Sequence, residues 1–151
     1  MLSPGDPAPP FVLASDRGET VRLADLRGKP VVLYFYPKDD TPGCTVEACE
    51  FRDNWEAVRK AGAVILGVSP DGVESHQKFV RKFSLPFPLL ADPDHAVAEA
   101  YGAWGEKRLY GLKRLGILRT TFVIDEDGRI KRVFERVKPE GHAAQVMEAL
   151  R

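Results

Sequence analysis

The chain contains two cysteines, Cys44 and Cys49, and their place in the sequence favours redox chemistry. An apolar run at residues 31–36 is followed by a short segment with prolines and a glycine, which leads directly to Cys44. A strand, a turn and then a helix would put Cys44 at a helix N-terminus, where backbone N–H groups and the helix dipole favour a thiolate. A reactive thiolate with a second thiol nearby is the minimum equipment for redox chemistry.

The spacing of the two cysteines makes a mechanical prediction. A helix over residues 43–60 places Cys44 on one apolar stripe with Ala48, Phe51, Trp55 and Val58. Cys49 then lies about 140° around the helix from Cys44 and ~8–9 Å away at Cα. Because a disulfide needs Cα atoms within roughly 7 Å, the two cysteines can join only if the first turns unwind. Oxidation should therefore melt the start of this helix.

Other uses of a cysteine pair stay open at this point. A buried free cysteine often behaves as a small hydrophobic residue, which would leave a structural domain with inert cysteines. A noncatalytic redox sensor or binding module, switched by Cys44–Cys49 oxidation, would use the same residues. A zinc site fits poorly, because four ligands are usual and the sequence has no second cysteine pair or histidine cluster. Repeated turnover of peroxide would distinguish an enzyme from a sensor.

Composition limits the class of protein. The 151 residues suit one domain, and 44% hydrophobic residues suffice for a core. Lys+Arg and Asp+Glu balance at 22 each, which argues against nonspecific binding to nucleic acid or to an anionic membrane. No apolar run approaches the ~18 residues of a membrane span, and the first residues lack a signal pattern. We expect a cytoplasmic protein. In the reducing cytoplasm, two close cysteines are catalytic or metal-binding more often than they form a structural disulfide.

Periodicity and turn residues predict one domain over residues 1–151, of α/β class with a central mixed sheet flanked by helices. Two short strands around the turn at residues 15–18 predict an N-terminal β-hairpin. The remaining expected strands are at 31–36, 63–69, 89–91, 120–124 and 129–134, and the helices at 43–60, 73–83, 95–101 and 139–150. Residues 102–118, which are basic and contain several glycines, are expected to form a loop.

The segment around the first cysteine also resembles a known family. The pattern Pro37-x-x-x-Thr41-x-x-Cys44 is similar to the active-site signature of peroxiredoxins. The longer stretch at residues 34–53 resembles the bacterioferritin comigratory protein, or peroxiredoxin Q, subfamily. The resemblance extends over nearly the whole chain, through matching segments at residues 5–9, 67–69, 89–92, 101–107 and 119–125. It implies a thioredoxin-like fold, which agrees with the order of elements.

The resemblance implies a thiol peroxidase in which Cys44 is the peroxidatic and Cys49 the resolving cysteine. Cys44 would reduce hydrogen peroxide or an organic hydroperoxide and become a sulfenic acid. Cys49 would then form an intramolecular disulfide with it, and thioredoxin or a glutaredoxin-like dithiol would reduce this disulfide. The resemblance implies no metal, haem or flavin, and it favours a monomer.

Three further site residues follow from the resemblance. Arg119 would stabilise the thiolate and donate hydrogen bonds to the peroxide oxygens. Thr41 would hold the peroxide through its hydroxyl, and Pro37 would shield the site from bulk water. From spacing alone, Pro37 and Thr41 could be turn residues and Arg119 a surface arginine. Glu47 could pair with Arg119 or with a surface lysine, and the sequence leaves it unassigned.

The other titratable residues suggest no second chemistry. The three histidines, at positions 76, 95 and 142, fall at predicted helix surfaces or helix starts and form no Ser/His/Asp constellation. Asp125, Asp127 and Gly128 are similar to part of a calcium loop but lack its later acidic ligands. We expect a hairpin turn there.

Overall fold

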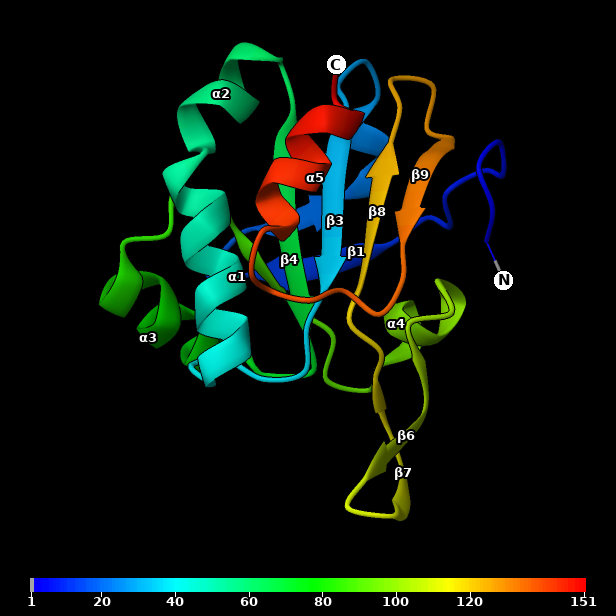
Figure 1. The fold of residues 1–151 in the computed structure, drawn as a ribbon. Coiled ribbons are helices and arrows are strands. Elements are labelled where there is room, and N and C mark those ends of the chain that lie inside the picture. Colours follow the sequence, from blue (N-terminus) through cyan, green and yellow to red (C-terminus); the bar gives the residue numbers. More distant parts are fainter. Residues whose placement is uncertain (1) are drawn as a thin grey trace.

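The computed structural model describes residues 2–151, and within them the main strands form one seven-stranded sheet (Figure 1). The order is β2-β1-β5-β4-β3-β8-β9. The three central strands β5, β4 and β3 are parallel, and the outer pairings are antiparallel, so the sheet is mixed, as predicted. The strands are β1 (Val12–Ser15), β2 (Thr20–Arg22), β3 (Val31–Phe35), β4 (Val64–Ser69), β5 (Leu89–Ala91), β8 (Thr120–Ile124) and β9 (Ile130–Phe134).

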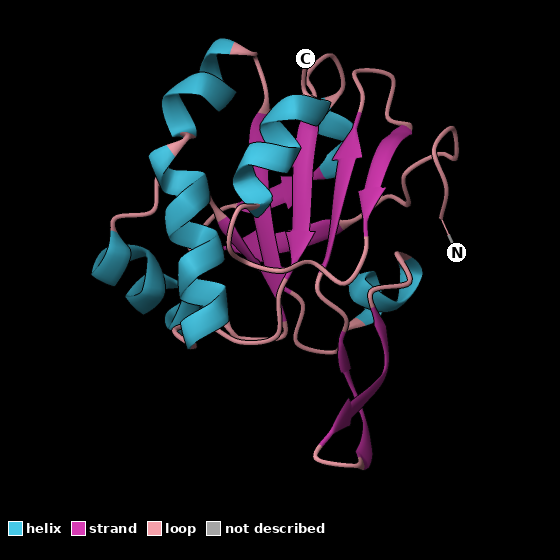
Figure 2. Cartoon of the chain, in the orientation of Figure 1, coloured by secondary structure: helices cyan, strands magenta, loops and turns pink. Residues whose placement is uncertain are grey.

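Helices cover both faces of this sheet (Figure 2). Residues of α1 (Pro42–Asp53), α2 (Trp55–Lys60), α3 (Val73–Phe83) and α5 (His142–Ala149) join the core on one face. Residues of α4 (Ala96–Ala100) and of the short 3-10 helix η1 (Leu23–Leu26) join the core on the other. This arrangement, with β1 and β2 as the N-terminal hairpin, confirms the predicted fold class.

Strand β3 explains why its sequence is apolar throughout. Val31, Leu33 and Phe35 point into the core on one face, and Val32 and Tyr34 into the core on the other. All five are buried, as expected for a central strand that is covered on both sides. The central strand β3 therefore leads directly into the loop at residues 37–41 and then into the start of α1 (Figure 1).

The helix predicted at residues 43–60 is two helices, because the chain turns at Asn54. Asn54 has φ −101° and ψ 7°, and its side-chain amide donates a hydrogen bond to the carbonyl oxygen of Glu50 at 2.8 Å. Asparagine side chains compete in this way with the backbone bonds of a helix. The apolar stripe continues across the break, which is why periodicity alone predicts one helix.

The prediction of a loop at residues 102–118 is wrong for most of this segment. Here β6 (Trp104–Leu109) and β7 (Leu112–Ile117) pair as an antiparallel hairpin, with Tyr110 and Gly111 both at positive φ in the two-residue turn. A turn of this kind with glycine in second place is a hairpin signal. The signal is hard to see because the strands carry lysines and arginines where alternating apolar residues are expected.

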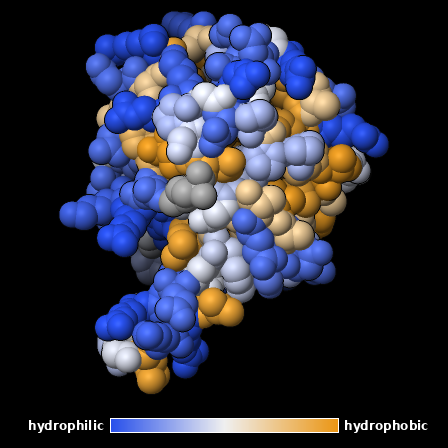
Figure 3. Space-filling view, turned by 90° about the vertical axis from the view of Figure 1, so that its right-hand side faces the viewer, coloured by the Kyte–Doolittle hydropathy of each residue, from blue (hydrophilic) through white to orange (hydrophobic). Residues whose placement is uncertain are grey.

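The β6–β7 hairpin projects from the body of the protein (Figure 1). Figure 3 shows this arm as mostly hydrophilic, with hydrophobic side chains near its end. Leu112 and Leu115 are 59% and 67% exposed, so the arm adds little to the core beyond its base.

The other predicted helices and strands differ from the observed ones by at most three residues at either end. The turn at Asp125–Gly128 connects β8 and β9, as expected for a hairpin. Across residues 2–151, we find no helix that combines the length and the apolar character needed to cross a membrane.

Candidate active site

Cys44 lies in the first turn of α1, as the sequence predicts. Thr41 is the residue before the helix, and Pro42 occupies the first helical position, where its missing N–H costs nothing. The first intrahelical bond runs from the Thr45 N–H to the carbonyl oxygen of Thr41. The N–H groups of the first turn have no partner within the helix, so their partial positive charge lies beside Cys44. Cys44 itself is only 1% exposed.

The pairing of β3 with β8 brings Arg119 to this helix start. Thr120 lies opposite Phe35 in the antiparallel register, so the residue before β8 sits beside the residues that follow β3. Arg119 Nη2 donates a hydrogen bond to Cys44 Sγ at 3.3 Å, and Nη1 donates to Glu47 Oε1 at 2.8 Å. Glu47 is one helical turn beyond Cys44. One guanidinium thus bridges the thiol and a buried carboxyl group.

Burial sets the electrostatics of this cluster. It raises the pKa of Glu47 to about 7, and the charge and hydrogen bonds of Arg119 only partly oppose this. Burial alone would lower the pKa of Arg119, but the charges of Glu47 and Cys44 outweigh it and raise that pKa. Arg119 therefore stays charged while Glu47 changes charge near neutral pH. Cys44 and Glu47 share one cation, which stabilises a negative charge on either of them.

The backbone at the helix start leaves little room around the guanidinium. A Cβ atom at Gly43 would lie 3.3 Å from Arg119 Nη2 and 3.4 Å from Pro139 Cγ. Lys107, in β6, is half-buried near the same cluster, and burial followed by the charge of Arg119 lowers its pKa. Gly43 thus permits close contact between helix and arginine, and Lys107 adds a second positive group nearby.

The remaining predicted site residues lie on the same segment. The Thr41 hydroxyl donates to the carbonyl oxygen of Lys38 at 2.8 Å, which closes the turn that precedes α1. Pro37 is half-buried at the beginning of this turn. Cys49 lies further along α1, is half-buried, and is a free thiol like Cys44. The structure therefore gathers Thr41, Cys44 and Arg119 at the helix start and leaves Cys49 outside this group.

Sequence reasoning missed the surroundings of two histidines. His76, predicted at a helix surface, is fully buried in α3. His142 is at the start of α5 as predicted but is also buried, and its Nε2 lies 2.8 Å from the hydroxyl oxygen of Thr121. Burial lowers the pKa of His142. His76 shares a helix face with Phe79 and Phe83, three and seven residues on, and this spacing was the available signal.

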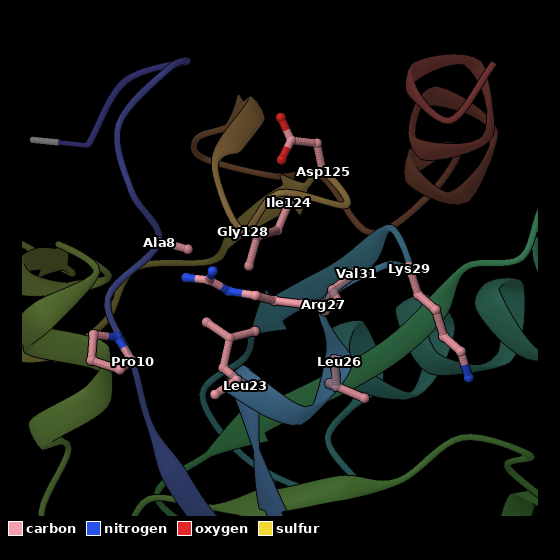
Figure 4. Close-up of a pocket in the computed structure, with 11 residues that line it drawn as sticks. Ala8, Pro10, Leu23, Leu26, Arg27, Lys29, Val31, Ile124, Asp125 and Gly128 are labelled. Carbon is pink, nitrogen blue, oxygen red and sulfur yellow. The ribbon is translucent and has the colours of Figure 1, made fainter.

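A separate pocket of about 70 Å³ lies at the opposite end of β3 (Figure 4). It is lined by Val31, the first residue of β3, and by Ile124, the last residue of β8, whereas Cys44 follows the other end of β3. Figure 4 shows the Arg27 side chain reaching across it, with its guanidinium group toward Ala8. None of the predicted site residues lines this pocket, which is therefore separate from the cluster around Cys44.

The chain is similar to a known protein family over most of its length. The AhpC/TSA family matches residues 4–133 of the chain. Peroxiredoxin Bcp of Bacillus subtilis is 50% identical over 147 residues, which cover 97% of this chain and 94% of that protein. Peroxiredoxin Bcp of Escherichia coli is 47% identical over 150 residues, which cover 99% of this chain and 96% of that protein.

Solved structures of related proteins have the same fold. A cysteine mutant of PrxQ from Xylella fastidiosa superposes with a TM-score of 0.93 at 35% identity, covering 99% of this chain and 96% of that one. The bacterioferritin comigratory protein of Xanthomonas campestris, studied for alkyl peroxide reduction, gives a TM-score of 0.89 at 41% identity, covering 93% of this chain and 89% of that one.

The fold and these relatives thus define a thioredoxin-like, thiol-dependent peroxidase. The chain belongs to the AhpC/TSA family, and its similarity to the Bcp and PrxQ proteins confirms the resemblance to the bacterioferritin comigratory protein subfamily of peroxiredoxins.

Proposed function

We propose that Cys44 is the peroxidatic cysteine of this peroxidase and Cys49 its resolving cysteine. The observation that carries the proposal is the 3.3 Å hydrogen bond from Arg119 to Cys44 Sγ at a helix N-terminus. A cation and helix N–H groups both stabilise a thiolate, which is the nucleophilic form. Cys49 is the second thiol of the chain and lies on the same helix.

The reaction begins when the Cys44 thiolate attacks one oxygen of the peroxide. A sulfur–oxygen bond forms, the oxygen–oxygen bond breaks, and the departing oxygen takes a proton and leaves as water or an alcohol. Arg119 donates to the peroxide oxygens as negative charge develops on them, and the Thr41 hydroxyl holds the peroxide in line. Pro37 keeps bulk water from the sulfur. Cys44 is then a sulfenic acid, and the peroxide has gained two electrons.

Resolution requires a change of shape. Ideal helix geometry separates the two Cα atoms by ~8–9 Å, and a disulfide needs roughly 7 Å or less. The first turns of α1 therefore unwind, and the Cys49 sulfur attacks the sulfenic sulfur. A disulfide forms, and water leaves with the sulfenic oxygen. A dithiol reductant then exchanges with the disulfide, becomes oxidised itself, and returns both cysteines to thiols.

The substrates and partners follow from this cycle. We infer that hydrogen peroxide and organic hydroperoxides are both reduced; the alkyl peroxide reduction studied in the similar Xanthomonas protein supports the second class. Thioredoxin or a glutaredoxin-like protein supplies the electrons. The chain works as a monomer with a single domain in the cytoplasm, and the cycle uses no metal or organic cofactor.

Steady-state peroxide consumption tests these roles. Wild type, Cys44→Ser and Cys49→Ser are each assayed with hydrogen peroxide and with cumene hydroperoxide, using thioredoxin, thioredoxin reductase and NADPH. We expect turnover in wild type, none in Cys44→Ser and a strong loss in Cys49→Ser. Full activity of Cys49→Ser would contradict the resolving role. A parallel assay with glutaredoxin, glutathione and glutathione reductase shows which class of dithiol recycles the enzyme.

A further inference from the structure

The carboxylate of Asp39 is buried, although Asp39 lies on the surface loop between β3 and α1. Its Oδ1 atom accepts a hydrogen bond from the Tyr36 hydroxyl at 2.5 Å, and its Oδ2 atom accepts one from Ser75 Oγ at 2.8 Å. Nδ1 of His76 lies 2.7 Å from the same Oδ2 atom. Ser75 and His76 both belong to α3, so these bonds fasten the loop to that helix.

The partners of His76 determine which hydrogen bonds its two ring nitrogens make. Nε2 lies 2.9 Å from the carbonyl oxygen of Leu90, which can only accept a hydrogen bond, so Nε2 carries a proton. Nδ1 faces a carboxylate oxygen that already accepts from Ser75. Two acceptor atoms 2.7 Å apart would repel each other, so one proton lies between Nδ1 and this Oδ2 atom. His76 and Asp39 thus form a buried hydrogen-bonded pair.

A second set of bonds reinforces this attachment. The backbone N–H of Asp39 donates to Asp71 Oδ2 at 2.7 Å. Nζ of Lys82, in α3, lies 2.8 Å from Asp40 Oδ2. Asp39, Asp71 and His76 bring potential metal-ligand atoms within 4.8 Å of one another. Hydrogen bonds from described residues already engage these groups, so the cluster is explained as a tether between loop and helix without an ion.

The tethered loop is the segment that carries Pro37 and Thr41, and it leads into the first turn of α1 and Cys44. We propose that His76 and Asp39 are positioning residues whose hydrogen-bonded pair holds this loop in the arrangement that presents Cys44 to Arg119. The pair thereby sets the balance between the folded form, which reacts with peroxide, and the unwound form, in which Cys49 reaches Cys44. This inference rests on the cysteine roles proposed above.

Loss of the His76–Asp39 pair has a kinetic consequence that loss of packing elsewhere lacks. Without the tether, the loop and the first turn of α1 spend less time folded and more time unwound. Oxidation of Cys44 by peroxide then slows, while formation of the Cys44–Cys49 disulfide becomes faster. The ratio of the second rate constant to the first rises, whereas a small loss of packing on the other face of the sheet, which keeps the tether intact, leaves it unchanged.

Rapid mixing of the reduced protein with hydrogen peroxide measures both rate constants, with acid quenching and mass spectrometry to count sulfenic acid and disulfide. The variants are His76→Gln, Asp39→Asn and the double variant. We expect the ratio of disulfide formation to oxidation to rise about tenfold in each single variant. The double variant should resemble the single ones, because either change breaks the same pair.

Tyr101→Phe is the matched control. It removes a buried hydroxyl that donates to the carbonyl oxygen of Pro9 at 2.6 Å, on the other face of the sheet, and keeps the ring in place. Its ratio should equal that of wild type. An unchanged ratio in His76→Gln and Asp39→Asn, with wild type cycling normally, would overturn the positioning role alone. Absence of sulfenic acid at Cys44 in wild type would instead contradict the proposed function.

The His76–Asp39 hydrogen bond can be measured without a variant that might unfold. In proton NMR spectra of histidine-labelled wild type, we expect a downfield proton in this hydrogen bond that is protected from exchange with solvent. Its absence would overturn the pair, even if the kinetic ratio changed.

Discussion

Arg119 Nη2 lies 3.3 Å from Cys44 Sγ, although 75 positions separate the two residues in the chain. Arg119 directly precedes β8, a buried strand of the sheet, whereas Cys44 belongs to the helix that unwinds in the proposed cycle. Unwinding therefore takes the sulfur away from its cation, and refolding restores the pair. In the proposed cycle, the reduced and folded enzyme is therefore the form in which Arg119 can assist the reaction of Cys44 with peroxide.

Replacement of Arg119 tests the value of this contact. A hydrogen bond to a charged group contributes about 1.5–3 kcal/mol, so Arg119→Met should lower the rate constant for Cys44 oxidation roughly 10- to 100-fold. Stopped-flow tryptophan fluorescence with excess peroxide measures it. Arg114→Met, which removes an exposed arginine of β7, is the control and should react like wild type. Equal rates for both variants would exclude a role for Arg119.

The raised pKa of Glu47 predicts how stability depends on pH. The folded protein holds the Glu47 proton up to a pKa of about 7, whereas the unfolded chain releases it near the ordinary value of 4.5. The unfolded state thus binds fewer protons in this window, and the free energy of unfolding should fall as pH rises through it. The total loss of unfolding free energy from Glu47 is on the order of 3 kcal/mol. It is complete once the pH exceeds the folded-state pKa of about 7.

Urea unfolding of reduced protein across this pH window checks the effect. Glu47→Gln cannot ionise, so the fall in its free energy of unfolding with pH should be smaller than in wild type. The difference between the two proteins isolates Glu47, because all other titrating groups are shared. Parallel curves for wild type and Glu47→Gln would show that Glu47 titrates in the folded protein as it does in the unfolded chain.

Local features of the sequence were enough to predict the helix start and its cysteine. The apolar run ending before Pro37 and the turn before Cys44 act through neighbouring residues, and the structure contains the strand and helix that they indicate. The contact with Arg119 depends instead on the register between β3 and β8. Spacing cannot supply a register, so only the family resemblance singled out this arginine.

The difference between local sequence features and contacts made only in the folded chain also explains the wrong predictions. The break at Asn54 depends on one side-chain bond to Glu50 that leaves the hydrophobic period intact. The β6–β7 hairpin has exposed strands and therefore little periodic pattern. His76 is polar, but a carbonyl group of β5 and the carboxylate of Asp39 satisfy its ring inside the core. That network joins three separate segments and is visible only in the folded chain.

Gly43 should be sensitive to a single added methyl group. In Gly43→Ala, the new Cβ would approach Arg119 Nη2 to 3.3 Å, so the guanidinium must shift by a few tenths of an ångström. We expect oxidation of Cys44 to slow roughly tenfold, with little loss of stability because alanine favours a helix. Gly72→Ala, where no atom lies within 4 Å of the new Cβ, is the control. An unaltered rate in Gly43→Ala would mean that this contact does not position Arg119.

The hydroxyl of Thr41 should matter for peroxide binding and little for the helix. No side-chain capping bond links Thr41 to α1, so Thr41→Val loses only the bond to the Lys38 carbonyl and any bond to peroxide. We expect the rate constant for oxidation to fall roughly 2- to 10-fold, and Thr41→Ser to recover most of it. Rates measured at several peroxide concentrations decide this; a valine variant as fast as wild type would remove Thr41 from the site.

The most direct test of the account traps the oxidised sulfur. Reduced wild type and Cys49→Ser are each treated with one equivalent of hydrogen peroxide in the presence of dimedone, digested and analysed by mass spectrometry. The account predicts a dimedone adduct on Cys44 in Cys49→Ser, and an intramolecular Cys44–Cys49 disulfide in wild type. A sulfenic acid adduct on Cys49, or wild-type protein without the disulfide, would contradict it.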